Sequence, residues 1–178
     1  MKALVAVLVL ALAGLAAWFF VSTPETAPPA EMSDAEIAQI EAEVEQIVRG
    51  LYSSVAQAEV GPWMATLHER TGPWLLGMDI GNLRETSEGF EALYTSEDET
   101  RPVRQEMDNL EIRVVAVSPT IAYAVGTSPD RRWYLANGGI DRAATAETWV
   151  FVQTEGGWKL YSGQTAIFPI EDEEEGQP

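Results

Sequence analysis

The sequence contains no cysteine and a single histidine, His68. Without cysteine the chain can form no disulfide, no thiol nucleophile and no lipidated-cysteine anchor. One histidine per chain also excludes a histidine-rich metal site, so we expect neither a metal nor a cofactor. Stability must therefore come from an apolar core. The chain has the means for one, because hydrophobic residues make up 46% of it and include six tryptophans.

Basic residues are scarce as well. Eleven Lys and Arg stand against 28 Asp and Glu, which gives a net charge of -17. This charge repels phosphate backbones, so nucleic acid is excluded as a partner. It also disfavours contact with anionic lipid, and we expect membrane association only through the hydrophobic N-terminal segment.

An uninterrupted apolar run follows Lys2 and covers residues 3–21. Its length is roughly 28 Å as a helix, close to the ~30 Å hydrocarbon core of a bilayer. A cleaved signal peptide is the alternative, with small residues at 13–17 as the cleavage region. The aromatic residues 18–20 resemble an interfacial anchor and favour the uncleaved form. Both alternatives predict an extracytoplasmic protein of the bacterial type, periplasmic or secreted.

Composition divides the chain into four parts. Residues 1–22 are the predicted signal peptide or membrane anchor, and residues 23–32 form a proline-containing linker that stays extended. Residues 33–169 are the predicted folded domain. Residues 170–178 form an acidic tail whose like charges prevent packing, so we expect it to be disordered.

The first part of the domain is predicted to be helical. Ser33 and Glu36 have the spacing of a capping box, and apolar residues then recur at helical spacing over residues 34–58. Pro62 suits the first turn of a short second helix. Ser87 is the predicted N-cap of a short third helix.

The rest of the domain is predicted to be a sheet. Residues 74–80 read as a first strand, with a turn at Gly81-Asn82. Further strands are predicted at 110–114, 121–125, 132–136, 146–154 and 158–168, and Gly156-Gly157 indicates a tight hairpin between the last two. Helices followed by a run of antiparallel strands predict an α+β fold, with one long and two short helices packed on a curved sheet.

Two stretches carry a family resemblance. Residues 146–161, AETWVFVQTEGGWKLY, are similar to the penultimate strand, hairpin and last strand of SnoaL-like domains in the nuclear-transport-factor-2-like superfamily. Residues 81–94 are similar to the exit of the first strand and the short helix after it. The resemblance covers residues 34–169 and implies a cone, in which a strongly bent, mostly antiparallel sheet wraps around the long first helix.

The resemblance also implies where a site would lie. Isomerase and dehydratase relatives use carboxylate, tyrosine or histidine groups inside the cone. Relatives often carry histidine on the last strand, where this chain has Ser162 and Gln164, and neither is a strong general base. Candidates for acid–base work here are Asp79, Tyr52 and His68.

Each candidate has an alternative interpretation. Asp79 lies in an apolar strand and either faces solvent or lines the cone. Tyr52 lies on the apolar stripe of the first helix and either packs by its ring or offers its hydroxyl to a pocket. His68 is in a polar helix end and is expected to be solvated.

Alternation on the last strand suggests further ligand contacts. Trp158 and Leu160 share a face with Ser162 and Gln164, so we expect all four to point inward and the Trp158 ring to anchor the strand on the first helix. The predicted ligand-binding residues are Tyr52, Trp74, Asp79, Trp149, Ser162 and Gln164.

Two functions remain open on the sequence. The favoured one is a non-catalytic domain that holds a small apolar ligand in its cone or self-associates as a homodimer. The alternative is a cofactor-independent lyase, isomerase or hydrolase with Asp79 and Tyr52 as acid–base groups. An open cavity with these two side chains facing each other would favour the enzyme, and a plugged cone would contradict both.

Overall fold

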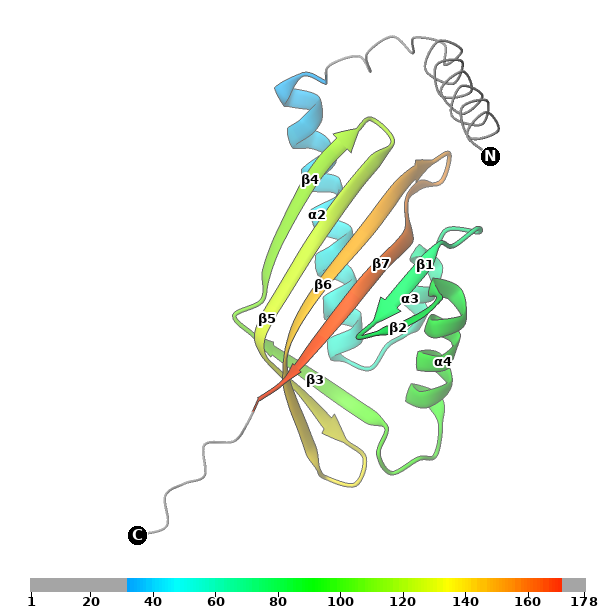
Figure 1. Ribbon diagram of the computed structural model, residues 1–178, viewed down its shortest axis with the longest axis vertical. Helices are drawn as coiled ribbons and strands as arrows, with labels where there is room; N and C mark the ends of the chain where they lie inside the picture. The colour runs from blue at the N-terminus through cyan, green and yellow to red at the C-terminus, as the bar shows by residue number, and fades with distance from the viewer. Residues whose placement is uncertain (1–31, 171–178) are drawn as a thin grey trace, which may run out of the picture. The chain divides into compact units, whose positions relative to one another are not determined.

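The computed structural model describes residues 32–170, so residues 1–31 and 171–178 lie outside it, together with the predicted anchor, nearly all of the predicted linker and nearly all of the predicted tail. Its elements, labelled in Figure 1, are α2 (Asp34–Ala56), α3 (Gly61–Thr66), β1 (Pro73–Leu76), β2 (Asp79–Asn82), α4 (Leu83–Thr95), β3 (Pro102–Asp108), β4 (Glu111–Ser118), β5 (Ile121–Leu135), β6 (Ile140–Thr154) and β7 (Gly157–Pro169).

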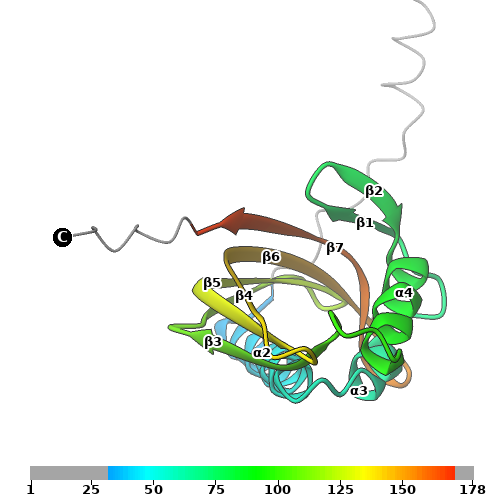
Figure 2. The same ribbon diagram turned by 90° about the horizontal axis from the view of Figure 1, so that it is seen from below.

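One sheet contains all seven strands. Its order is β2-β1-β7-β6-β5-β3, and β4 also pairs with β5. Every pairing is antiparallel except that of β1 with β7. Figure 2 shows the sheet arching over α2, with α3 and α4 on one side of the enclosed space. The predicted α+β cone is confirmed.

Helix α2 begins at the predicted capping box. The Glu36 N–H donates to Ser33 Oγ at 3.3 Å, and the Ser33 N–H donates to Glu36 Oε2 at 2.8 Å. These bonds satisfy donors that a helix start leaves unpaired. The helix ends at Ala56, and its buried stripe includes Val44 and Val48.

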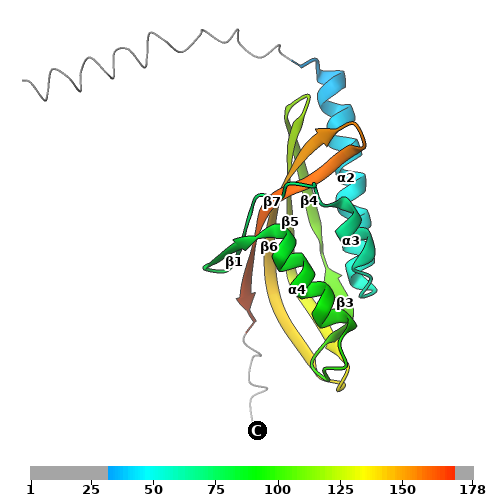
Figure 3. The same cartoon turned by 90° about the vertical axis from the view of Figure 1, so that its right-hand side faces the viewer.

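The first strand is a hairpin, so the prediction of one strand over 74–80 is wrong. The turn lies at Gly77, which has a φ of 61°, a value that glycine adopts without the steric cost of a Cβ. The predicted cap at Ser87 is also wrong. Asn82 caps α4 by accepting from the Arg84 N–H at 2.9 Å, and Ser87 is buried one turn inside the helix. Figure 3 shows α4 beside this hairpin.

Sequence patterning also missed β3 and divided β5 in two. The predicted strands 121–125 and 132–136 are parts of the single strand β5, which contains a bulge between Ser128 and Arg131. The bulge interrupts the alternation, and the sequence pattern therefore breaks although the strand does not. The hairpin between β6 and β7 is where it was predicted, with Thr154 paired to Gly157.

One half of the cone is filled, and we call it the closed half. There Val44 and Val48 of α2 are packed in one core with Phe151 and Leu160 of the sheet, and all four are 0% exposed. Trp158 Nε1 donates to Glu43 Oε2 of α2 at 3.2 Å, which confirms that this ring anchors β7 on the first helix. The other end of the cone, the open half, is hollow.

Candidate ligand-binding site

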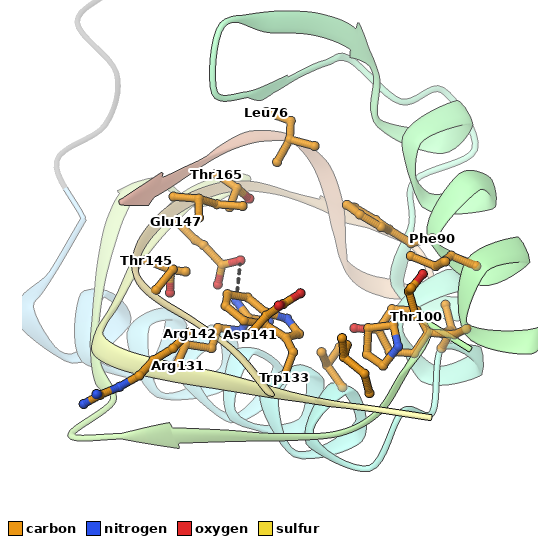
Figure 4. Close-up of a pocket in the computed structure, with 18 of the residues that line it drawn as sticks. Leu76, Phe90, Thr100, Arg131, Trp133, Asp141, Arg142, Thr145, Glu147 and Thr165 are labelled. Atoms are coloured by element: carbon orange, nitrogen blue, oxygen red, sulfur yellow. Dashed lines mark hydrogen bonds and ion pairs between the residues drawn. The ribbon is translucent and has the colours of Figure 1, made fainter. Parts of the chain in front are cut away.

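The open half contains a cavity of about 560 Å³ (Figure 4). Aromatic and aliphatic side chains dominate its lining, and a few polar groups lie on the β5–β6 wall. The lining residues are Val55, Val60, Trp63, Trp74, Leu76, Phe90, Leu93, Tyr94, Thr100, Pro102, Arg131, Trp133, Leu135, Asp141, Arg142, Ala143, Thr145, Glu147, Thr165, Ile167 and Pro169. An apolar concavity with a few placed polar groups is the usual form of a small-molecule site.

A nearly buried ion pair lies in this wall. Arg131 Nη1 is 3.2 Å from Glu147 Oε1, and the two side chains are only 9% and 10% exposed. The Tyr52 hydroxyl donates to Glu147 Oε2 at 2.6 Å. Burial and the adjacent Glu147 carboxylate raise the pKa of Tyr52 well above its usual range, so its hydroxyl keeps its proton and remains a donor.

Gln105 and Tyr94 extend the hydrogen-bond network of this ion pair. Arg131 Nε donates to Gln105 Oε1 at 2.9 Å, and Gln105 Nε2 donates to the Tyr94 hydroxyl. The guanidinium carbon of Arg131 also lies 5.1 Å from the centre of the Trp133 ring. Burial raises the pKa of Tyr94. The buried charge is thus both paired and hydrogen-bonded, as burial requires.

Trp63 of α3 and Trp74 of β1 form an aromatic wall of the cavity, and Trp149 of β6 packs against Trp63. The Trp63 ring meets Trp74 and Trp149 edge to face, with centroids 6.0 and 5.7 Å apart. Trp63 Nε1 donates to Ser87 Oγ at 2.9 Å, and Trp149 lies 5.0 Å from the Tyr52 ring. These contacts fix the orientation of the rings, because edge-to-face pairs have a preferred geometry.

Bulges in β5 and β7 determine which side chains point into the cavity, and the bulge in β5 places Arg131 there. In the closed half of β5 the buried residues are even-numbered, such as Ala124 and Ser128. Three residues of β5 then span two of β6, since Ser128 pairs with Thr145 and Arg131 with Ala143. The extra residue turns Arg131 inward, where strict alternation would place Asp130.

The close approach of the Tyr52 side chain to β5 explains why one residue of this strand is glycine. Gly126 faces Tyr52, and a Cβ at this position would overlap the tyrosine hydroxyl. Only a residue without a side chain therefore lets Tyr52 reach Glu147 across the core.

The predicted ligand contacts are only partly brought together. Trp74 lines the cavity, and Tyr52 and Trp149 lie directly behind the lining. Asp79 is exposed on β2 and absent from the lining, so the solvent-facing alternative holds and its predicted place among the ligand contacts is wrong. The hairpin turn at Gly77 carries this carboxylate out to solvent.

The predicted inward placement of Ser162 and Gln164 is also wrong. Leu160 pairs with Phe151 and Ser162 with Val150, which leaves Tyr161 as an extra residue in β7. After this bulge the odd-numbered residues face inward. Thr165 consequently lines the cavity, whereas Gln164 is exposed.

His68 takes no part in the site. Its Nδ1 contacts the backbone of Arg70, its ring lies 5.9 Å from that of Tyr161, and it is absent from the lining. Within residues 32–170 there is no group of three or more histidines or carboxylates placed to hold a metal ion.

Sequence reasoning missed Arg131, Glu147 and Gln105. The inward placement of Glu147 could have been predicted, because Glu147 alternates in step with Thr145, Trp149 and the other inward residues of β6. The inward placement of Arg131 could not, since the bulge reverses the alternation just before it.

No protein-family model matches the sequence, and no curated protein matches it. Solved structures do match. A hexachlorocyclohexane dehydrochlorinase, LinA-type3 from Novosphingobium barchaimii LL02, has 15% identity and a TM-score of 0.57 over 82% of this chain and 100% of its own. The association domain of Caenorhabditis elegans CaMKII has 12% identity and a TM-score of 0.55 over 75% and 99%.

A nuclear transport factor 2 (NTF2-like) superfamily protein from Salmonella enterica has 14% identity and a TM-score of 0.55, over 79% of this chain and 99% of its own. This domain has the NTF2-like fold. The resemblance seen in the sequence is therefore confirmed at the level of the fold. NTF2-like neighbours include an enzyme and an association domain, so the NTF2-like fold alone does not choose between these functions.

No helix within residues 32–170 is long and apolar enough to cross a membrane.

Proposed function

We propose that the domain is a non-catalytic binding module that holds a small, mainly apolar molecule in its cone. The observation that supports this is the open cavity of about 560 Å³, which the side chains of residues 32–170 leave unfilled. Its size falls within the roughly 300–1,000 Å³ of small-molecule pockets. Aromatic walls and a small cluster of polar groups suit the orientation of a ligand.

Acid–base catalysis is the less favoured function. Each Glu147 carboxylate oxygen already accepts a hydrogen bond, one from Arg131 and one from Tyr52. The raised pKa of Tyr52 keeps its hydroxyl neutral. Asp79, the other predicted acid–base group, is exposed outside the lining. The arrangement of these three side chains therefore favours ligand binding over proton transfer.

Native mass spectrometry of the full chain purified from its own cells tests this proposal. Ala143 lines the cavity, whereas its neighbour Ala144 faces the outside of the sheet. We expect a bound small molecule on the parent protein, its loss in Ala143→Phe because the ring fills the cavity, and its retention in Ala144→Phe. Equal occupancy of the two variants would contradict a ligand in the cone.

We also propose that the domain lies outside the cytoplasm, on the strength of the apolar run at residues 3–21. Alkaline phosphatase fused after residue 31 should then be active in cells. Activity of a cytosolic reporter fused at the same point, with an inactive phosphatase, would contradict this location.

Self-association is a further proposal, and it concerns the outer face of β5, β6 and β7. Residues 121–127, 144–152 and 158–168 contain one acidic residue, the inward Glu147, although the chain carries 28. Apolar side chains are exposed there, including Ile121 at 41% and Tyr123 at 37%. A face without acidic groups allows two copies of an acidic protein to meet without charge repulsion.

Analytical ultracentrifugation tests this interface. Val150 lies on the outer face of β6, and Gln153 is exposed near the end of the same strand. We expect a dimer that Val150→Glu dissociates and Gln153→Glu leaves intact. A monomeric parent protein at high concentration would contradict the interface.

A further inference from the structure

The polar groups of the cavity form one directed chain of hydrogen bonds. Glu147 accepts from Tyr52 at one oxygen and from Arg131 at the other. Because a guanidinium can only donate, Gln105 presents its Oε1 to Arg131. The amide nitrogen of Gln105 therefore donates to Tyr94. Donor and acceptor chemistry thus fixes the direction of every link.

This chain of bonds ends in donors. The Tyr94 oxygen accepts from Gln105, and its own proton has no acceptor among residues 32–170. The second terminal nitrogen of Arg131, Nη2, likewise makes no hydrogen bond within that part of the chain. Both residues line the cavity. Burial raises the pKa of Tyr94, so the hydroxyl keeps the proton that it can donate.

The charge of the cluster limits what these donors can bind. Arg131 and Glu147 are nearly buried and neutralise each other. At this buried pair a carboxylate would be repelled by Glu147, because Arg131 is already paired with Glu147 and Arg142, the other lining cation, with Asp130. An ammonium group at the same place would be repelled by Arg131. Uncompensated charge is costly in such a weakly solvated place.

We propose that the cavity takes an apolar molecule that ends in an uncharged hydrogen-bond acceptor, such as a ketone, ester or amide carbonyl. Its oxygen accepts from the Tyr94 hydroxyl and from Arg131 Nη2, and its apolar body lies against the aromatic wall that contains Trp63 and Trp74. This inference rests on the proposed binding function and names the chemical class of its ligand.

Three matched probes test the inference by calorimetric titration of the full chain. Methyl naphthyl ketone carries an uncharged acceptor, naphthoate carries an anionic one, and ethylnaphthalene carries none. We expect the ketone to bind about tenfold more tightly than each of the other two, which corresponds to one strong or two weak hydrogen bonds to donors already in place.

A variant separates the acceptor contact from general packing. Tyr94→Phe keeps the ring and removes the donor, so it should weaken ketone binding about three- to tenfold and leave ethylnaphthalene binding unchanged. Tyr134→Phe, on β5 and outside the cavity lining, is the matched control and should change neither. Near-ultraviolet circular dichroism shows whether Tyr94→Phe folds, and if it does not, the probe series on the parent protein decides.

The outcomes separate this inference from the proposed function. Equal binding of ketone and ethylnaphthalene, or tighter binding of naphthoate, would overturn the acceptor class and leave the binding function standing. A Tyr94→Phe variant that weakens all three probes equally would overturn the contact with Tyr94. If none of the probes binds, both proposals are contradicted.

Discussion

The closed and open halves of the cone are built from the same three strands, yet their interiors are opposite in character. In the closed half β6 and β7 contribute Phe151 and Leu160, both 0% exposed, to a packed core. In the open half β5 and β6 contribute Arg131 and Glu147 to the wall of a cavity. The comparison teaches that one part of a strand can build a packed core while another part of the same strand lines a cavity.

Helix α2 explains part of this division. Its buried residues Val44 and Val48 pack within the closed half, whereas only Val55, near its end, lines the cavity. Because α2 ends before it reaches the open half, it does not cover the sheet there. Apolar surface there stays available to a ligand.

The largest expected effect compares two tryptophans, one from each half. Trp158 is 6% exposed in the closed half, and Trp133 is partly exposed in the cavity wall. Trp158→Ala should cost about 3–5 kcal/mol of unfolding free energy, because it removes a buried ring from a packed core. Trp133→Ala should cost about 1 kcal/mol, since it enlarges an existing cavity.

Urea denaturation of both variants measures this difference. Equal losses of stability would show that the open half is as important to folding as the closed half, and the division between them would be wrong.

An intermediate effect concerns the ion pair. Arg131→Met leaves the Glu147 charge buried with only Tyr52 as a partner, and should cost about 3 kcal/mol. Adding Glu147→Gln removes that charge and should restore part of the loss. A double-mutant cycle by thermal unfolding measures the coupling, and strictly additive effects would show that the pair makes no net contribution.

Much of the fold followed from the sequence. The capping box at Ser33, the long amphipathic helix and the hairpin before Trp158 were predictable because each depends on local spacing. The cavity lining was less predictable. A prediction from alternation assumes that every second residue of a strand points inward. A bulge adds one residue to the strand without a clear signal in the local sequence, so the inward face of β7 was misassigned after Tyr161.

The smallest expected effect tests this bulge in β7. Gln164 is exposed and Thr165 lines the cavity. Gln164→Ala should change both stability and probe binding by less than about 0.5 kcal/mol. Thr165→Val keeps the shape of the side chain and removes a hydroxyl from the wall, so it should leave stability nearly unchanged and alter the binding of methyl naphthyl ketone. Titration of both variants checks the assignment, which is wrong if Gln164→Ala is the variant that changes binding.

The extra residues in β5 and β7 mark positions where the strands can change length without changing the inside of the protein. Deleting Tyr161 would remove the bulge, but Ser162 would still pair with Val150 and Thr165 with Glu147, so the cavity wall would keep its residues. Straightening the bulge without deleting a residue would instead move the rest of β7 by one position and exchange Thr165 for Gln164 at the wall. One residue can therefore be gained or lost at each bulge while the same side chains line the cone.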